Sequence, residues 1–145
     1  MSKRNGSRDE YRFFLAMPTR WSDNDRYGHA DSAACHAYFD TAVARCLIDS
    51  GAPCPADSPV IGVVVETHCR YFGPIGFPDT LAAGVRVGHL GNTSVRYEIG
   101  LFREGESVAS AEGHLVHVYV DRETRRQPMP LPPALRAALA PLLAD

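Results

Sequence analysis

The sequence has 145 residues, with 15 basic and 17 acidic side chains and a formal net charge of −2 when histidine is neutral. Hydrophobic residues make up 45% and charged residues 22% of the chain, which is ordinary for a globular domain. These values exclude a disordered, collagen-like or coiled-coil chain, and the nearly balanced charge gives no electrostatic footprint for nucleic acid. A chain of this length can bury one substantial core, so we expect a single domain over residues 11–145.

The first residues, MSKRNGSRDE, lack the hydrophobic stretch of a signal peptide, and we expect residues 1–10 to form a flexible polar tail. No apolar run approaches the ~20 residues that span a bilayer, so we expect a cytoplasmic protein without membrane contact. The four cysteines form no C-x-x-C pair and no zinc spacing, which predicts reduced, buried thiols; they are Cys35, Cys46, Cys54 and Cys69.

The first half of the chain predicts a strand, a polar loop and a long helix. An apolar patch within residues 11–20 indicates the strand, and residues 21–32 are polar and rich in turn formers. Over residues 33–50, apolar side chains recur at steps of three and four, which is typical of an amphipathic helix. Gly51 follows as a natural C-terminal cap residue.

The second half predicts strands and a short terminal helix. The Val-rich segment from residue 60 to 72 is nearly continuous in apolar residues, as in a strand covered on both faces. Alternating apolar residues within 81–87, 95–102 and 107–120, with turn residues between them, indicate an antiparallel meander. Residues 134–143 follow a Pro-rich segment and predict a helix.

Together these elements predict an α+β fold in which one long central helix packs on a curved antiparallel β-sheet, with a short C-terminal helix. One helix cannot cover the whole sheet. We therefore expect a remaining face or edge to meet a partner subunit.

The densest group of reactive side chains precedes the long helix and consists of Asp23, Asp25, His29 and Asp31. A helix N-terminus carries unpaired amides and a partial positive charge, which can polarise a carbonyl or hold an oxyanion. A carboxylate in the preceding loop can attack that carbonyl or activate a water. Turn and cap formation explains the same residue types without any chemistry. No second acidic–histidine cluster completes a metal shell, so we expect no metal.

The segment W-S-D-N-D-R-Y-G-H-A-D-S-A, followed by A-Y-F-D, resembles the D-x-D-x-x-G-H-x-N-N segment of hot-dog-fold acyl-CoA thioesterases of the 4-hydroxybenzoyl-CoA thioesterase group. Three further segments are similar to that family: R-Y-F-G-P-I-G-F-P-D-T-L, G-N-T-S-V-R-Y-E-I and V-Y-V-D-R-E-T-R-R-Q-P-M-P-L-P. The resemblance covers about residues 11–140. It implies a hot-dog fold, hydrolysis of an acyl-CoA thioester without a cofactor, and a homodimer or homotetramer.

The resemblance also implies roles for individual residues. The second Asp of D-x-D matches Asp25, which would be the catalytic carboxylate, while Asp23 would be structural. The amides that would polarise the thioester carbonyl lie around Asp31 and Ser32.

Four further residues would shape the site, namely Tyr27, Gly28, His29 and Cys35. The sequence departs from the family pattern in three places: Asp31-Ser32 replaces a paired Asn, Cys35 replaces a frequent Tyr, and the acidic-Arg pattern of the helix reads Asp40-Thr41-Ala42-Val43. Asp31 adds negative charge near Asp25, which can raise the pKa of that carboxyl or oppose an attacking anion.

Candidates for contact with the CoA moiety are side chains that can bind a phosphate or the pantetheine arm; they are Arg70, Thr93, Ser94, Arg103 and Arg122. The sequence does not choose among them. Two other functions remain open on the same fold. One is an enoyl-thioester hydratase or dehydratase with His29 in an acid–base pair, and the other is a non-catalytic module that binds acyl-CoA.

Overall fold

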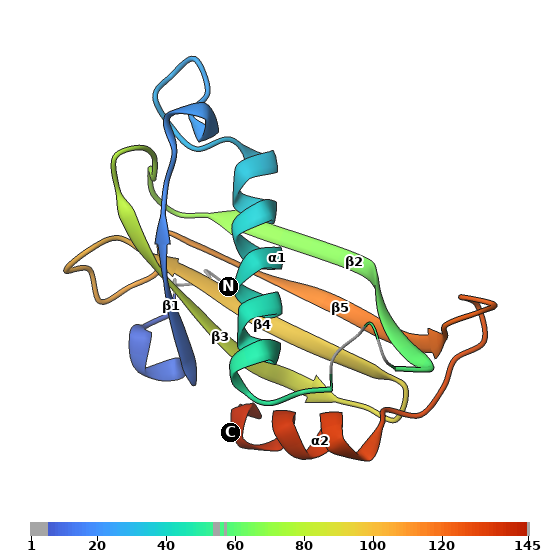
Figure 1. Cartoon of the computed structure of the whole chain (residues 1–145). Helices are drawn as coiled ribbons and strands as arrows, with labels where there is room; N and C mark the ends of the chain where they lie inside the picture. The colour runs from blue at the N-terminus through green and yellow to red at the C-terminus, as the bar shows by residue number, and fades with distance from the viewer. Residues whose placement is uncertain (1–5, 54–55, 57, 145) are drawn as a thin grey trace, which may run out of the picture.

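A computed structural model of the protein describes residues 6–144 except residues 54, 55 and 57. It confirms the α+β arrangement, in which a long helix lies across one face of a five-stranded antiparallel sheet (Figure 1). The sheet order is β1-β3-β4-β5-β2. The main elements are β1 (Phe13–Pro18), α1 (Ser32–Asp49), β2 (Val60–Tyr71), β3 (Thr80–Leu90), β4 (Ser94–Phe102), β5 (Ala111–Asp121) and α2 (Pro133–Leu139). Short 3-10 turns are η1 (Arg8–Glu10), η2 (Trp21–Asp23) and η4 (Ala140–Leu142).

Helix α1 forms where the apolar periodicity predicts it. Asp31 caps its N-terminus, and Gly51 follows its C-terminus with a φ of +77°, a left-handed conformation that favours glycine. The residues that α1 buries against the sheet recur at helical spacing; they are Cys35, Tyr38, Phe39, Ala42, Val43 and Cys46. Opposite them, β3 and β4 bury alternate side chains, as the predicted meander requires. No helix of the described residues is long and apolar enough to cross a membrane.

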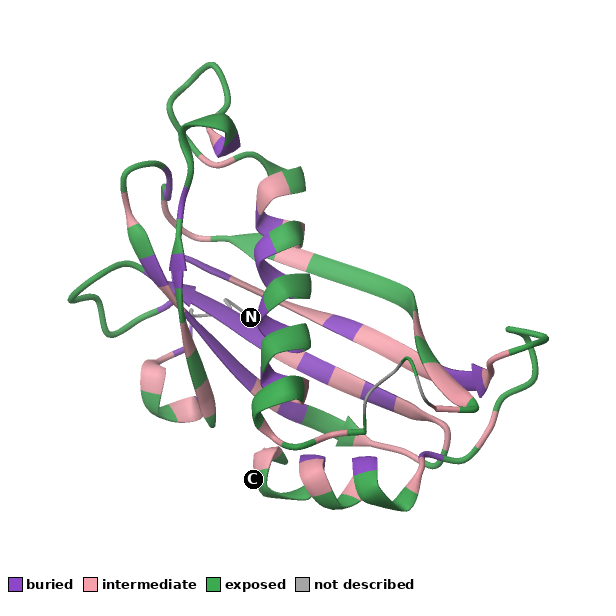
Figure 2. Ribbon diagram, in the orientation of Figure 1, coloured by how far each residue is buried: buried purple, intermediate pink, exposed green. Residues whose placement is uncertain are grey.

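Strand β2 lies at the edge of the sheet, and its exposure differs from the prediction. Val64 is 48% and Val65 is 57% exposed, and Figure 2 shows most of β2 as exposed. The expectation of a strand covered on both faces is therefore wrong for the single chain. The reason is that β2 is an edge strand, paired only with β5 among the described strands, and α1 lies near one end of it only, so most of its length has no element packed over it (Figure 1).

Residues 6–10, which we expected to belong to a flexible tail, instead pack onto the sheet. Arg8 N–H donates to the Ser107 carbonyl at 3.0 Å, and Ala109 N–H donates to the Gly6 carbonyl at 2.8 Å. The segment therefore continues the domain on the face opposite α1. Residues 1–5 lie outside the described residues.

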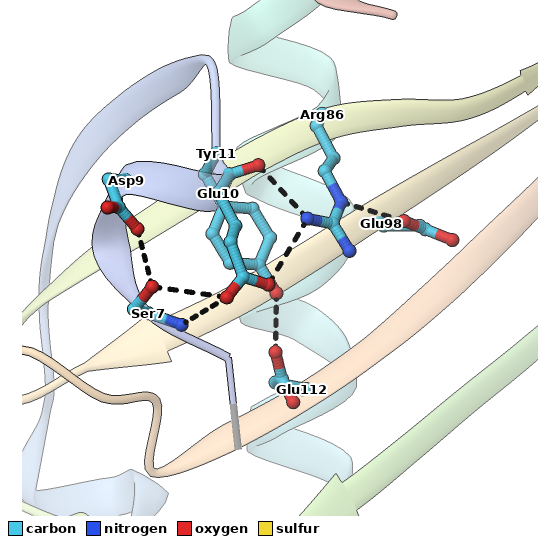
Figure 3. A network of polar contacts seen from close by, with 7 residues as sticks. All are labelled: Ser7, Asp9, Glu10, Tyr11, Arg86, Glu98 and Glu112. Carbon is cyan, nitrogen blue, oxygen red and sulfur yellow. Dashed lines mark hydrogen bonds and ion pairs between the residues drawn. The ribbon is translucent and has the colours of Figure 1, made fainter. Parts of the chain in front are cut away.

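A polar network anchors this N-terminal segment (Figure 3). The Tyr11 hydroxyl donates to Glu112 at 2.8 Å. Arg86 donates to Glu98 at 2.8 Å and to the Glu10 carbonyl at 3.0 Å. The same guanidinium lies 4.9 Å from the centroid of the Tyr11 ring, a cation–π distance. These contacts fix the start of β1, from which the chain enters the loop that precedes α1.

Candidate active site

The loop before α1 closes on itself as a narrow hairpin. Asp31 N–H donates to the Asp23 carbonyl at 3.1 Å, and Asn24 and Ala30 form a β-bridge one step further out. Since Asp31 is also the N-cap of α1, this hairpin is joined directly to the helix N-terminus.

Asp25 pairs with His29 at the tip of the hairpin, where the chain turns. Its N–H donates to the His29 carbonyl at 2.7 Å, and its own carbonyl accepts from Gly28 N–H at 3.1 Å. Gly28 has a φ of +82°, so the predicted tight chain path does require glycine here. Asp25 is exposed to solvent.

The Asp25 carboxylate is held by the backbone of its own loop. Oδ1 accepts from Tyr27 N–H at 2.8 Å and from His29 N–H at 3.2 Å. These bonds, with the one from His29 the largest contribution, lower the pKa of Asp25 below its usual 3.8. Asp25 is therefore ionised at neutral pH, the state in which a carboxylate can act as a base or nucleophile. No hydrogen bond to its Oδ2 is found in the described part of the chain.

The helix N-terminus offers fewer free amides than the sequence indicates. The Asp31 side chain accepts from Ala34 N–H at 2.8 Å, and the Asp31 N–H is already donated to Asp23. The Asp31 amide is thus not available to a substrate, which corrects one of the two predicted oxyanion donors. Ser32 and Ala33 N–H have no hydrogen-bond partner among the described residues. Ser32 is the predicted donor that remains.

The length of the hairpin gives the separation between the backbone of Asp25 and the start of α1. Asp25 lies two residues beyond Asp23, and the rise of extended chain is ~3.3 Å per residue. The backbone of Asp25 therefore lies about 7 Å from Asp23 and from Asp31, the N-cap residue that is hydrogen-bonded to Asp23.

Asp23 is buried and fully engaged, in agreement with the structural role that the resemblance implied. It accepts from Arg20 N–H at 2.9 Å, from the Arg20 guanidinium at 3.0 Å and from the Tyr38 hydroxyl at 2.6 Å. Burial opposes ionisation, but the bonds from Tyr38 and Arg20 prevail and hold the pKa of Asp23 below 3.8. Asp23 thus ties the start of the loop to α1.

The other site-shaping residues differ in their contacts. Cys35 is fully buried, and burial, with smaller contributions from Cys69 and Asp31, raises the pKa of its thiol to about 12. Cys35 is therefore a neutral packing residue beneath the first turn of α1. Tyr27 and His29 have exposed side chains and serve Asp25 through their backbone amides.

The structure adds contacts that the sequence did not indicate, from the β2–β3 turn. Ala30 N–H donates to the Ile75 carbonyl at 2.6 Å, and Phe77 N–H donates to the Asn24 side chain at 2.9 Å. Residues 73–79 connect β2 to β3. The Gly- and Pro-rich composition marks that turn, but nothing in it indicates which loop it contacts.

The candidate CoA-binding residues do not form one site within a chain. Thr93 and Ser94 lie at the β3–β4 turn, near the end of α1 that is remote from Ser32 (Figure 1). The 18 residues of α1 make that separation about 27 Å along the helix. Arg122, beyond β5, donates to the Ser58 carbonyl at 2.6 Å.

The two remaining arginines have different surroundings. Arg103 forms an ion pair with Asp79 at 3.6 Å. Arg70 is paired in register with Glu112, next to Gly113, which faces α1; alternation places Arg70 on the opposite face of the sheet. In the described part of the chain, no three His, Cys, Asp or Glu side chains are placed to hold a metal ion.

Residues 19–139 match the model of the Thioesterase-like superfamily, and the chain belongs to that superfamily. A search of curated proteins found no match. Among solved structures, the chain is similar to the PA5185 protein from Pseudomonas aeruginosa strain PAO1, with 45% identity, a TM-score of 0.91 and coverage of 97% of this chain and 98% of that one.

Two further structures are more distant. The PA2801 protein from Pseudomonas aeruginosa, a putative thioesterase, is 27% identical with a TM-score of 0.77, covering 88% of this chain and 97% of that one. The BH1999 gentisyl-coenzyme A thioesterase is 22% identical with a TM-score of 0.76, covering 88% of this chain and all of that one (100%), and supports the fold alone. The predicted hot-dog thioesterase fold is thereby confirmed.

Proposed function

We propose that the protein hydrolyses an acyl-CoA thioester to a carboxylic acid and free CoA. The observation that carries this proposal is the closed hairpin, which joins an ionised, exposed Asp25 to the start of an 18-residue helix, where the Ser32 amide has no partner among the described residues. Membership in the Thioesterase-like superfamily supports the same reaction class.

In the proposed reaction, Ser32 N–H donates to the thioester carbonyl oxygen and stabilises the negative charge that develops there. The Asp25 carboxylate either attacks the carbonyl carbon or takes a proton from the attacking water. The C–S bond then breaks, and CoA leaves as the thiolate. In the direct route, water hydrolyses the resulting acyl-aspartyl anhydride and restores the carboxylate.

We also propose that the working unit is a homodimer or a homotetramer. The exposed edge of β2, with Val64 and Val65, offers unpaired backbone groups and apolar side chains to a second copy. Asp25 is open to solvent in one chain, and a partner subunit would enclose the substrate-binding side of this residue.

A panel of acyl-CoA thioesters, short, long and aromatic, tests the proposed reaction by release of free thiol. Turnover of at least one member supports it. Hydration of crotonyl-CoA without thiol release would instead show the hydratase. Thermal stabilisation by CoA ligands without turnover anywhere on the panel would show a binding module.

A further inference from the structure

The β2–β3 turn contacts the hairpin of residues 23–31, which we call the Asp25 hairpin. The hairpin donates Ala30 N–H to the Ile75 carbonyl at 2.6 Å, and its Asn24 side chain accepts Phe77 N–H at 2.9 Å. Gly76 lies between these two contacts and is buried. The hairpin is thus attached to the turn on both sides of this glycine.

Gly76 leaves no room for a side chain. A Cβ at this position would lie 2.7 Å from the Gly28 carbonyl oxygen, 2.9 Å from Asn24 Oδ1 and 3.3 Å from Ala30 N. All three atoms belong to the Asp25 hairpin, and two of them are backbone atoms. A methyl group would therefore move the hairpin itself, because contacts below 3.0 Å are not tolerated.

The contacts continue from Gly76 to the carboxylate. Gly76 faces the carbonyl of Gly28, whose N–H donates to the Asp25 carbonyl. The residues on either side of Gly28, Tyr27 and His29, donate the two amide bonds to Asp25 Oδ1. A displacement of Gly28 thus reaches both amides that orient the carboxylate.

We propose that Gly76 is a positioning residue, whose missing side chain lets the β2–β3 turn set the conformation of the hairpin and the orientation of Asp25. This inference rests on the proposed role of Asp25 and goes beyond it, because it assigns part of the site to a turn about 50 residues away in the chain that need not touch the substrate.

Gly76→Ala tests the inference, with Gly73→Ala as the matched control. Gly73 lies in the same turn, but a Cβ there would meet only Ser110 Oγ, at an ordinary 3.9 Å. On the best substrate of the wild type, we expect Gly76→Ala to lower kcat about 10- to 100-fold with KM changed less than about threefold, since small misplacements of reacting groups are costly. Gly73→Ala keeps the wild-type kcat.

A second readout does not depend on turnover. Carboxyl ¹³C NMR follows the titration of Asp25, whose pKa the two amides hold below 3.8. In Gly76→Ala this pKa rises toward 3.8, while in Gly73→Ala it does not change. If Gly76→Ala does not fold, Asn24→Ala releases Phe77 N–H without adding bulk, and we expect a smaller change in the same direction.

The two readouts separate failure of the inference from failure of the proposed function. If Gly76→Ala folds and leaves both kcat and the Asp25 pKa at wild-type values, Gly76 does not position Asp25. If Gly76→Ala does not fold and Asn24→Ala leaves both values unchanged, the contact of the β2–β3 turn with the hairpin does not set the orientation of Asp25, which also overturns the inference. If the wild type hydrolyses no thioester, the proposed reaction fails, and the NMR titration alone decides the positioning role.

Discussion

The contact between Tyr38 and Asp23 gives the sharpest test of how the candidate site is attached to α1. Tyr38→Phe removes the hydroxyl that donates to the buried Asp23 carboxylate at 2.6 Å and leaves the ring in place. A hydrogen bond to a charged group contributes roughly 1.5–3 kcal/mol. For a domain of this size, 1 kcal/mol shifts Tm by about 3 °C, so we expect Tm to fall by about 4–10 °C.

Thermal unfolding followed by circular dichroism at pH 7 measures this change. Tyr27→Phe is the matched control, because Tyr27 is 75% exposed, and its Tm should stay within about 1 °C of wild type. The bonds from Tyr38 and Arg20 lower the pKa of Asp23, so their stabilisation is present above pH 3.8 and is lost as the pH falls through the folded-state pKa. The difference between Tyr38→Phe and wild type should therefore shrink below about pH 4. An unchanged Tm at pH 7 would refute the reasoning.

Three further predictions follow from the same structure. Asp31→Asn keeps a good N-cap but removes the negative charge of the residue next to Ser32, so we expect kcat to rise a few fold in a thiol-release assay; a lower kcat would contradict this. Burial lowers the pKa of His117, so wild-type stability should fall as the pH drops below about 6.5, by at most ~1.4 kcal/mol per pH unit. Urea unfolding should show this dependence weakened in His117→Gln and retained in His89→Gln, which alters an exposed histidine. Val65→Lys on the β2 edge should convert an oligomer into a species near the chain mass of 15.8 kDa by light scattering, and an unchanged mass would exclude this edge as the interface.

Local patterns predicted the elements of the fold well. The apolar periodicity and Gly51 predicted α1 within a residue at each end, because helix boundaries depend on nearby residues. The coverage of β2 was not predictable in the same way. A Val-rich strand is compatible both with burial inside one chain and with a position at the edge of the sheet, and the strand order distinguishes these two cases.

The candidate site shows the same division between local and long-range information. The contacts of Asp23 agree with the structural role that the resemblance implied, while the catalytic role of Asp25 stays a prediction. The sequence did not predict that the Asp31 amide is already hydrogen-bonded, because this depends on the backbone bond to Asp23 that closes the hairpin. The contact of Gly76 with Gly28 joins segments about 50 residues apart, and no local pattern encodes such a pairing.

The most direct test of the central claim is the initial rate of thiol release by Asp25→Asn on the acyl-CoA that the wild type hydrolyses fastest. Asparagine preserves the size of the side chain and an oxygen acceptor for the Tyr27 and His29 amides, but removes the charge. We predict a loss of kcat of about 10²- to 10⁴-fold, the usual contribution of an acid–base group, with an unchanged Tm. A variant that hydrolyses this substrate at the wild-type rate would contradict the assignment of Asp25.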